Sequence, residues 1–207
     1  MFYFAKTPWW LKKLYGRCIW DFSPIKKTIY LSFDDGPDPE VTTFVLAELK
    51  KYNAKATFFC IGKNVLENSD IYQMVINEGH SIGNHTHDHL NGWKTPGKVY
   101  IRNIDKASTY IDSDLFRPPY GKIKHSQIKL LKKLHPESKI IMWSVLSGDF
   151  DAGISPAKCL KNVIDNVESG AVVVFHDSKK AFNNLVYTLP LVLEYFSAKG
   201  FAFEKIN

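Results

Sequence analysis

Thr28-Ile29-Tyr30-Leu31-Ser32-Phe33-Asp34-Asp35-Gly36-Pro37 joins an apolar run to a pair of adjacent carboxylates. The first four residues are β-branched, aromatic or aliphatic, which predicts a buried strand. Asp34 and Asp35 therefore stand where the strand ends, and they repel each other unless something such as a cation holds them. An Asp-Gly turn between two elements would explain the same residues without any binding role. The partners that the rest of the chain offers decide between these readings.

Short strands and helices alternate along the whole chain. Strands are expected at residues 28–31, 55–61, 80–83, 115–117, 139–145, 171–175 and 201–203, and helices at 41–52, 71–77, 96–111, 127–134, 155–167 and 184–198. This alternation predicts βα units and a parallel sheet. Polar clusters follow strand after strand, at Asp34-Asp35, His85 to His89, Arg117, Asp149 and His176.

An irregular (β/α) barrel with about seven parallel strands is the fold that best fits this pattern. Active sites of such barrels are built at the C-terminal strand ends, which is where the polar clusters fall. An open doubly wound sheet would use the same edge, but it would concentrate its clusters at one crevice. The barrel is expected to be irregular because the strands are short and 207 residues fall short of the roughly 250 of a regular eightfold barrel.

Composition predicts one globular domain, with 45% hydrophobic and 14% aromatic residues. We expect residues 27–207 to form it and residues 1–26, which are aromatic and basic, to pack on it as an N-terminal segment. The formal charge of +6 favours anionic partners. The lysines are scattered and no nucleic-acid module is present, so no nucleic-acid partner is expected. Cys18, Cys60 and Cys159 lie far apart, as in a protein of a reducing compartment.

The N-terminal segment carries no readable secretion signal, because lysines interrupt its apolar run and no cleavage site follows. It also lacks the ~20 apolar residues of a transmembrane span. Its mixture of tryptophans and lysines allows a peripheral membrane contact instead. We therefore expect a monomer that is cytoplasmic or peripheral to the membrane.

His85-Thr86-His87-Asp88-His89 places three histidines within five residues. On a helical turn His85 and His89 share a face, and His87 points away toward a supporting or surface position. If the segment is extended, all three share a face and His87 becomes a ligand candidate. Neutral imidazole is a common metal ligand, so this cluster and the carboxylate pair predict a metal site. Two histidines and one aspartate leave coordination positions open, as catalytic sites do.

A hydrolytic site of this kind needs further groups besides the metal ligands. A carboxylate can take the proton of the attacking water, and a separate acid must protonate the leaving group. His176, at a strand end beside Asp177, is the candidate acid, although a buried histidine with satisfied hydrogen bonds would look the same. Arg117 follows a strand and is expected either to pair with a carboxylate or to form a surface salt bridge.

These motifs together resemble those of the polysaccharide deacetylases, the NodB-homology domain of carbohydrate esterase family four. The resemblance covers roughly residues 27–207, in four blocks whose order and spacing agree. The blocks are Ser32-Phe33-Asp34-Asp35-Gly36 for T-F-D-D-G, His85-Thr86-His87-Asp88-His89 for H-[ST]-x-x-H, Arg117-Pro118-Pro119-Tyr120 for R-x-P-Y, and Val174-Phe175-His176 for L-x-H. The family fold is a distorted β/α barrel.

The resemblance implies a role for each matched residue. Asp34 would be the general base, Arg117 would hold it, and His176 would be the general acid, tuned by Asp149. The metal ligands would be Asp35, His85 and His89, with Zn²⁺ as the expected ion and Co²⁺, Ni²⁺ or Mn²⁺ as alternatives. The Tyr120 backbone N–H would stabilise the oxyanion. The resemblance would also bring Pro119, Phe150 and Phe175 to the substrate.

Two departures concern the pocket. Phe150 stands where the family usually has a tryptophan, and the first aspartate of that D-x-x-D-W block is missing. Val174 replaces the leucine of L-x-H. Trp93 and Tyr120 are candidates for stacking on a sugar.

The resemblance implies a metal-dependent hydrolase that removes acetyl groups from N-acetylated amino sugars of the GlcNAc type in a polysaccharide or oligosaccharide. An O-acetyl esterase on xylan-type glycans is the first alternative, since it differs only in the leaving group. A catalytically weak glycan-binding protein on the same fold is the second.

Overall fold

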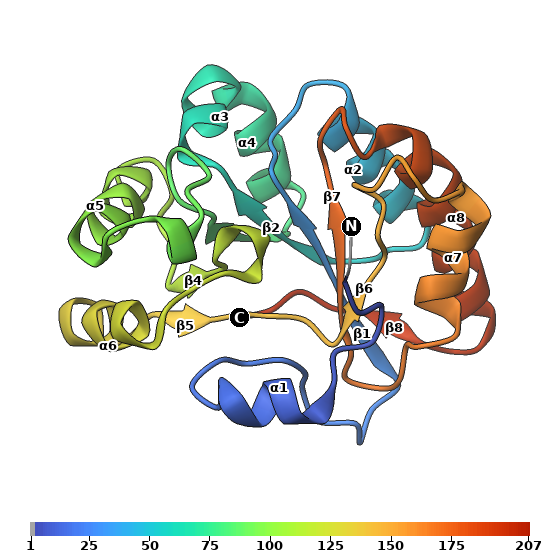
Figure 1. Ribbon diagram of the computed structural model, residues 1–207. Coiled ribbons are helices and arrows are strands. Elements are labelled where there is room, and N and C mark those ends of the chain that lie inside the picture. Colours follow the sequence, from blue (N-terminus) through green and yellow to red (C-terminus); the bar gives the residue numbers. More distant parts are fainter. Residues whose placement is uncertain (1–2) are drawn as a thin grey trace.

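The computed structural model describes residues 3–207, which form a curled parallel sheet surrounded by helices (Figure 1). The strands are β1 (Thr28–Asp34), β2 (Ala56–Cys60), β3 (Ser81–Asn84), β4 (Leu115–Phe116), β5 (Lys139–Ile140), β6 (Val145–Leu146), β7 (Val172–His176) and β8 (Ala202–Phe203). Their order is β5-β4-β3-β2-β1-β7-β6, with β8 beside β1. All of these pairings are parallel. The expected irregular (β/α) barrel is therefore confirmed.

Eight α-helices are assigned within residues 3–207, and those that connect the strands pack around the outside of the sheet (Figure 1). They are α1 (Trp9–Leu14), α2 (Val41–Lys51), α3 (Gly62–Glu67), α4 (Ser69–Asn77), α5 (Gly97–Ser108), α6 (His125–Leu134), α7 (Pro156–Ile164) and α8 (Phe182–Ala198). Two single 3₁₀ turns, η1 (Gly92–Lys94) and η2 (Pro119–Gly121), complete the set. No helix within residues 3–207 is long and apolar enough to cross a membrane.

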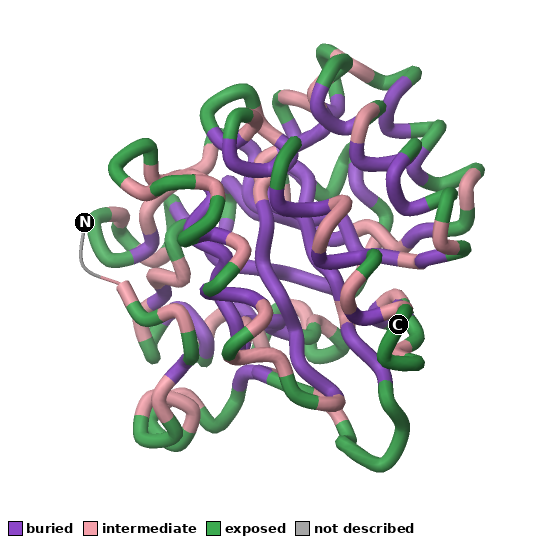
Figure 2. Tube along the Cα trace, turned by 90° about the vertical axis from the view of Figure 1, so that its right-hand side faces the viewer, coloured by how far each residue is buried: buried purple, intermediate pink, exposed green. Residues whose placement is uncertain are grey.

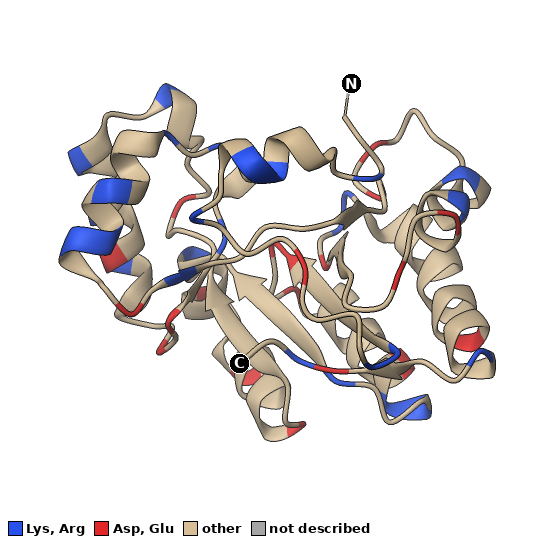
Figure 3. Ribbon diagram, turned by 90° about the horizontal axis from the view of Figure 1, so that it is seen from below, with Lys and Arg blue, Asp and Glu red and all other residues tan. Residues whose placement is uncertain are grey.

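Buried residues gather in the middle of the molecule (Figure 2), and the central strand β1 is buried at every residue except Tyr30. Phe33 of β1 stacks on Phe58 of β2 and Phe175 of β7, with ring centroids 5.1 and 6.0 Å apart. All three rings are at most 1% exposed. Lysines and arginines are spread over several of the surrounding helices (Figure 3). The core therefore fixes the strand whose end carries Asp34.

Several expected boundaries are wrong. The strand expected at residues 139–145 is split into β5 and β6, and the N-terminal segment bonds to the chain between them: the Met142 amide donates to the Ile19 carbonyl at 2.7 Å. Helix α3 was not expected, since six residues are too few to show a helical period. Helix α5 begins after Pro96, which is its N-cap. Helix α8 continues through Pro190.

The N-terminal segment lies across the gap between β5 and β6, the two ends of the strand order. The Ile19 amide donates to the Ile140 carbonyl at 2.8 Å on the β5 side. On the β6 side, the Leu146 amide donates to the Ala5 carbonyl at 2.8 Å, and the Thr7 amide donates to the Ser144 carbonyl at 2.9 Å. Backbone groups that an open sheet edge would leave unpaired are thus satisfied by this segment.

Candidate active site

A cavity of about 570 Å³ opens at the C-terminal strand ends, and both Asp34 and Asp35 line it. Adjacent strand residues point to opposite faces, so two neighbouring carboxylates need a break in the extended backbone to reach one site. The break is at Asp35 itself, whose φ is +81°. The turn at Gly36-Pro37 follows one residue later. The Gly36–Pro37 peptide bond is cis.

Asp35, His85 and His89 form a cluster whose candidate ligand atoms all lie within 4.8 Å of one another. Oδ1 of Asp35 lies 3.7 Å from Nε2 of His85 and 3.1 Å from Nε2 of His89. Ligands about 2.1 Å from a tetrahedral ion are separated by about 3.4 Å, so the two measured distances bracket the required spacing. Oδ1 of Asp35 is buried and accepts no hydrogen bond. The cluster thus fits a divalent cation.

The protonation of these side chains also suits a cation. Nδ1 of His85 lies 2.8 Å from the Arg117 carbonyl, which directs Nε2 and its lone pair toward Asp35. Burial lowers the pKa of His85 to about 4, so its imidazole is neutral near pH 7. Burial acts to raise the pKa of Asp35, but the contact with His89 and the charges of His176 and His85 outweigh burial and hold that pKa below its usual range.

Arg117 is fully buried and fixes Asp34. Its Nη1 donates to Oδ1 of Asp34 at 2.7 Å and to the Ser32 hydroxyl at 2.8 Å. Its Nε and Nη2 donate to the carbonyls of Ile141 and Met142. A buried, hydrogen-bonded pair of this kind holds the carboxylate in one orientation. The alternative of a surface salt bridge is excluded for Arg117, which is 0% exposed.

His176 and Asp149 form a second pair at the end of β7, and His176 lines the cavity. Nδ1 of His176 lies 2.8 Å from Oδ1 of Asp149, and the backbone amide of His176 donates to Oδ2 at 2.7 Å. Burial opposes protonation of His176, but the charge and hydrogen bond of Asp149 outweigh burial and raise the pKa to about 9. The imidazolium form therefore predominates at neutral pH, as a general acid requires.

The remaining expected substrate residues divide into two groups. Tyr120 and Phe150 line the cavity, and the Tyr120 ring centroid lies 4.6 Å from that of His89. Phe175 does not line it, because Val174 and His176 point to the cavity face of β7 and Phe175 points to the core. Pro119 is buried behind Tyr120 and is not among the lining residues. Trp93, 53% exposed, also lies outside the cavity lining.

The family model of the polysaccharide deacetylases matches residues 23–137, more than half of the chain. The chain belongs to the polysaccharide deacetylase family. It is 31% identical over 197 residues to a peptidoglycan-N-acetylglucosamine deacetylase of Bacillus cereus, covering 93% of this chain and 92% of that protein. It is also 31% identical to a chitooligosaccharide deacetylase of Azorhizobium caulinodans, covering 73% of this chain and 74% of that protein. By contrast, it spans 38% of a peptidoglycan deacetylase of Listeria monocytogenes, at 33% identity.

Solved structures of relatives agree with the fold. The Bc1960 peptidoglycan N-acetylglucosamine deacetylase, bound to 4-naphthalen-1-yl-N-oxidanyl-benzamide, superposes with a TM-score of 0.87 at 31% identity, covering 97% of this chain and 95% of that one. A pseudoenzyme of carbohydrate esterase family four from Bacillus anthracis has a TM-score of 0.78 at 23% identity, covering 91% of this chain and 66% of that one. This second likeness shows the fold alone.

Of the positions expected for His87, the structure excludes the ligand and surface positions. The segment is not helical, since Thr86 and His89 have φ values of +63° and +54°. These two left-handed residues bring His85 and His89 together and turn His87 inward. His87 is 5% exposed and stacks on Tyr110, outside the cation cluster. It is therefore neither a ligand nor a surface residue.

Asp177 supports the site from below, which the sequence did not reveal. Its Oδ1 accepts from the Gly36 amide at 3.0 Å, and its Oδ2 accepts from the Thr42 hydroxyl at 2.6 Å. The backbone amide of Asp177 donates to the Asp34 carbonyl at 3.0 Å. The position of Asp177 next to His176 in the sequence is a signal that its carboxylate belongs to the site. Only the fold shows that this carboxylate holds the turn after Asp35.

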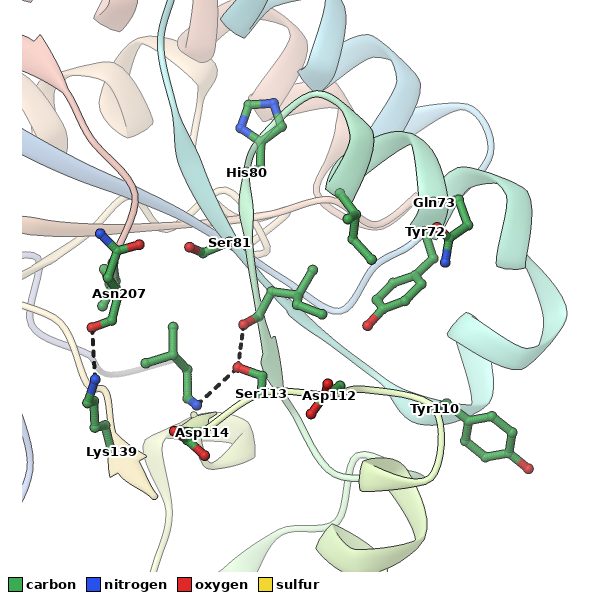
Figure 4. Close-up of a pocket in the computed structure, with 14 residues that line it drawn as sticks. Tyr72, Gln73, His80, Ser81, Tyr110, Asp112, Ser113, Asp114, Lys139 and Asn207 are labelled. Atoms are coloured by element: carbon green, nitrogen blue, oxygen red, sulfur yellow. Dashed lines mark hydrogen bonds between the residues drawn. The ribbon is translucent and has the colours of Figure 1, made fainter. Parts of the chain in front are cut away.

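A second cavity of about 580 Å³ lies at the opposite end of the sheet (Figure 4). Residues at the amino ends of β3, β4 and β5 line it, including His80, Ser113 and Lys139. His80 accepts a hydrogen bond from the Ala56 amide at Nδ1, and burial lowers its pKa to about 4. Ser113 bonds to the Ile82 carbonyl and Lys139 to the Asn207 carbonyl. These polar groups thus serve the packing of the strand ends.

Proposed function

We propose that this chain is a divalent-cation-dependent deacetylase that acts on N-acetylated amino sugars of the GlcNAc type in a polysaccharide or oligosaccharide. One observation carries the proposal: a single cavity is lined by the three-residue cation cluster, by Asp34, which the buried Arg117 holds, and by His176, which the buried Asp149 holds. Relatives that act on N-acetylglucosamine in peptidoglycan and on chitooligosaccharides support this class of substrate.

Asp35, His85 and His89 would hold the cation, with Zn²⁺ as the expected ion. When bound there, a divalent cation makes water more acidic and polarises a carbonyl group. The cluster supplies one carboxylate and two neutral imidazoles, a ligand set that leaves room for water and substrate.

Asp34 is the proposed general base. It would take a proton from the water that attacks the acetamide carbonyl carbon. Arg117 holds this carboxylate in one orientation at the cavity, because the guanidinium is itself fixed by four acceptors. The Tyr120 backbone N–H is proposed to donate to the oxyanion that forms as the carbonyl carbon becomes tetrahedral.

His176 is the proposed general acid. Its Nδ1 is held by Asp149, so Nε2 is the nitrogen that would deliver a proton to the departing amine. Breaking the C–N bond then gives acetate and a free amino sugar. The raised pKa of His176 keeps this proton available at neutral pH.

Acetate release from N-acetyl chito-oligosaccharides and from acetylated xylan, with and without a chelator, tests the proposal. We expect chelator-sensitive release from the N-acetylated substrate, lost in Asp34→Asn while Zn²⁺ still binds. Release from xylan alone would favour the O-acetyl esterase. No release from either substrate with Zn²⁺ present would favour a glycan-binding protein, and normal turnover by Asp34→Asn would exclude Asp34 as the base.

A further inference from the structure

Tyr3, from the N-terminal segment, lines the candidate active-site cavity together with Asp35, Phe150 and His176. The sequence predicted only that this segment packs on the domain or contacts a membrane. None of the four sequence blocks includes Tyr3. The structure therefore adds to the site a side chain that lies 31 positions before Asp34 in the chain.

The backbone around Tyr3 is held in place by the sheet. The Ala5 carbonyl accepts from the Leu146 amide of β6, and the Thr7 hydroxyl donates to the Trp143 carbonyl at 2.8 Å. Lys6 forms a salt bridge with Glu168 at 2.5 Å. Three successive residues, Ala5 to Thr7, are thus held by contacts with the rest of the domain, which aims the segment at the cavity.

The Tyr3 side chain fits closely against its surroundings. Its ring centroid lies 5.3 Å from that of Phe150, and Phe150 in turn lies 5.1 Å from His176. A Cβ atom at position 148 would lie 2.7 Å from the Tyr3 hydroxyl, so Gly148, with φ of +82°, leaves the space that this hydroxyl uses. Burial, then the charge and hydrogen bond of Asp151, raise the pKa of Tyr3 to about 12, so the hydroxyl stays a donor.

We propose that Tyr3 is a substrate-binding residue, whose ring continues the aromatic wall begun by Phe150 and packs against the N-acetylated sugar in the cavity. This inference rests on the proposed function. Aromatic rings offer a large, rigid apolar face at small entropic cost, which suits the C–H face of a sugar ring. The Tyr3 ring packs on Phe150, and Phe150 packs on His176, so Tyr3 itself does not contact the proposed acid. It therefore strengthens ground-state and transition-state binding alike, which lowers KM and leaves kcat unchanged.

Steady-state kinetics of Tyr3→Ala and Tyr3→Phe on N-acetyl chito-oligosaccharides test this inference. We expect Tyr3→Ala to raise KM about tenfold with kcat within twofold, because a stacked ring is lost while the acid and base stay in place. Tyr3→Phe should keep KM within about threefold. Trp9→Ala is the matched control: Trp9 is an aromatic of the same segment, 75% exposed and outside the cavity, and its loss should change neither constant.

A rescue variant distinguishes the loss of the aromatic cavity wall from a general disruption of the site. Phe150→Trp in the Tyr3→Ala background should recover part of the lost affinity, because the larger indole refills the wall. An unchanged KM in Tyr3→Ala would overturn the inference. A fall in kcat with unchanged KM would also overturn it, since Tyr3 would then act by supporting His176.

Binding measurements test the role of Tyr3 independently of whether the chain catalyses deacetylation. Calorimetric titration of N-acetyl chito-oligosaccharide into Asp34→Asn, with and without Tyr3→Ala, needs no turnover. Weaker binding in the double variant supports the inference even if the wild-type chain releases no acetate. Equal binding in the two variants, or no binding to either, would overturn it.

Discussion

Asp149→Asn tests the assignment of His176 as the acid. The substitution keeps the size of the side chain and removes its charge, together with the strongest acceptor for Nδ1 of His176. Asp149 is the main group that raises the pKa of His176 to about 9 against the effect of burial. Without it, the pKa of this buried imidazole should fall to its ordinary 6.5 or lower.

The size of the effect follows from the fraction of His176 that carries the proton. A pKa of 9 leaves about 90% of the imidazole protonated at pH 8, whereas a pKa of 6.5 leaves about 3%. Activity that needs the protonated form is lost as pH rises through the pKa, so the alkaline limb should move down by about two and a half pH units. Relative to its own value at pH 5, the variant should be about 30-fold slower than wild type at pH 8.

The assay is acetate release between pH 5 and 10 at saturating Zn²⁺ and substrate. A bound cation would reduce the smaller contributions that the charges of Asp35 and Asp34 make to the pKa of His176. The Zn²⁺ concentration is therefore the same in every measurement. Asp105→Asn is the control, since Asp105 pairs at 2.8 Å with the part-exposed His135, outside the cavity. An alkaline limb at the same pH in Asp149→Asn and wild type would refute the assignment of His176.

Three further predictions concern support of the site and localisation. Arg117→Met should lower the free energy of unfolding by about 3–5 kcal/mol in denaturant unfolding, because the charge of Asp34 stays buried without its partner. Adding Asp34→Asn should restore part of the lost stability. If the double variant recovers no stability, the pairing of Arg117 with Asp34 is contradicted. Gly36→Ala should weaken Zn²⁺ binding in calorimetry, because its Cβ would lie 2.0 Å from Oδ2 of Asp177 and displace the turn after Asp35; unchanged affinity would contradict this. Peripheral membrane contact predicts co-sedimentation with anionic vesicles, reduced in Trp9→Ala; no co-sedimentation of wild type would refute it.

Local residue patterns were sufficient to predict the parallel sheet and the ends of its strands. Periodicity in residues such as Ile29, Leu31 and Phe33 reflects which side chains are buried, and burial governs the choice between strand and helix. The same patterns could not predict the break between β5 and β6. That break depends on backbone hydrogen bonds to Ile19 and Thr7, more than 100 residues away.

Residue type, together with the resemblance to the family, indicated the chemistry of seven residues that the structure brings to one end of the sheet: Asp34, Asp35, His85, His89, Arg117, Asp149 and His176. Residue type could not give the left-handed backbone at Asp35, Thr86 and His89, by which these side chains converge.

The sequence by itself thus determined the kinds of groups at the site and the order in which the strands present them. Only the tertiary structure decided that Phe175 belongs to the core, that Asp177 holds the turn and that Tyr3 completes the cavity wall. The physical reason is that side-chain direction depends on backbone angles and on contacts between distant segments, and neither is a property of a local run of residues.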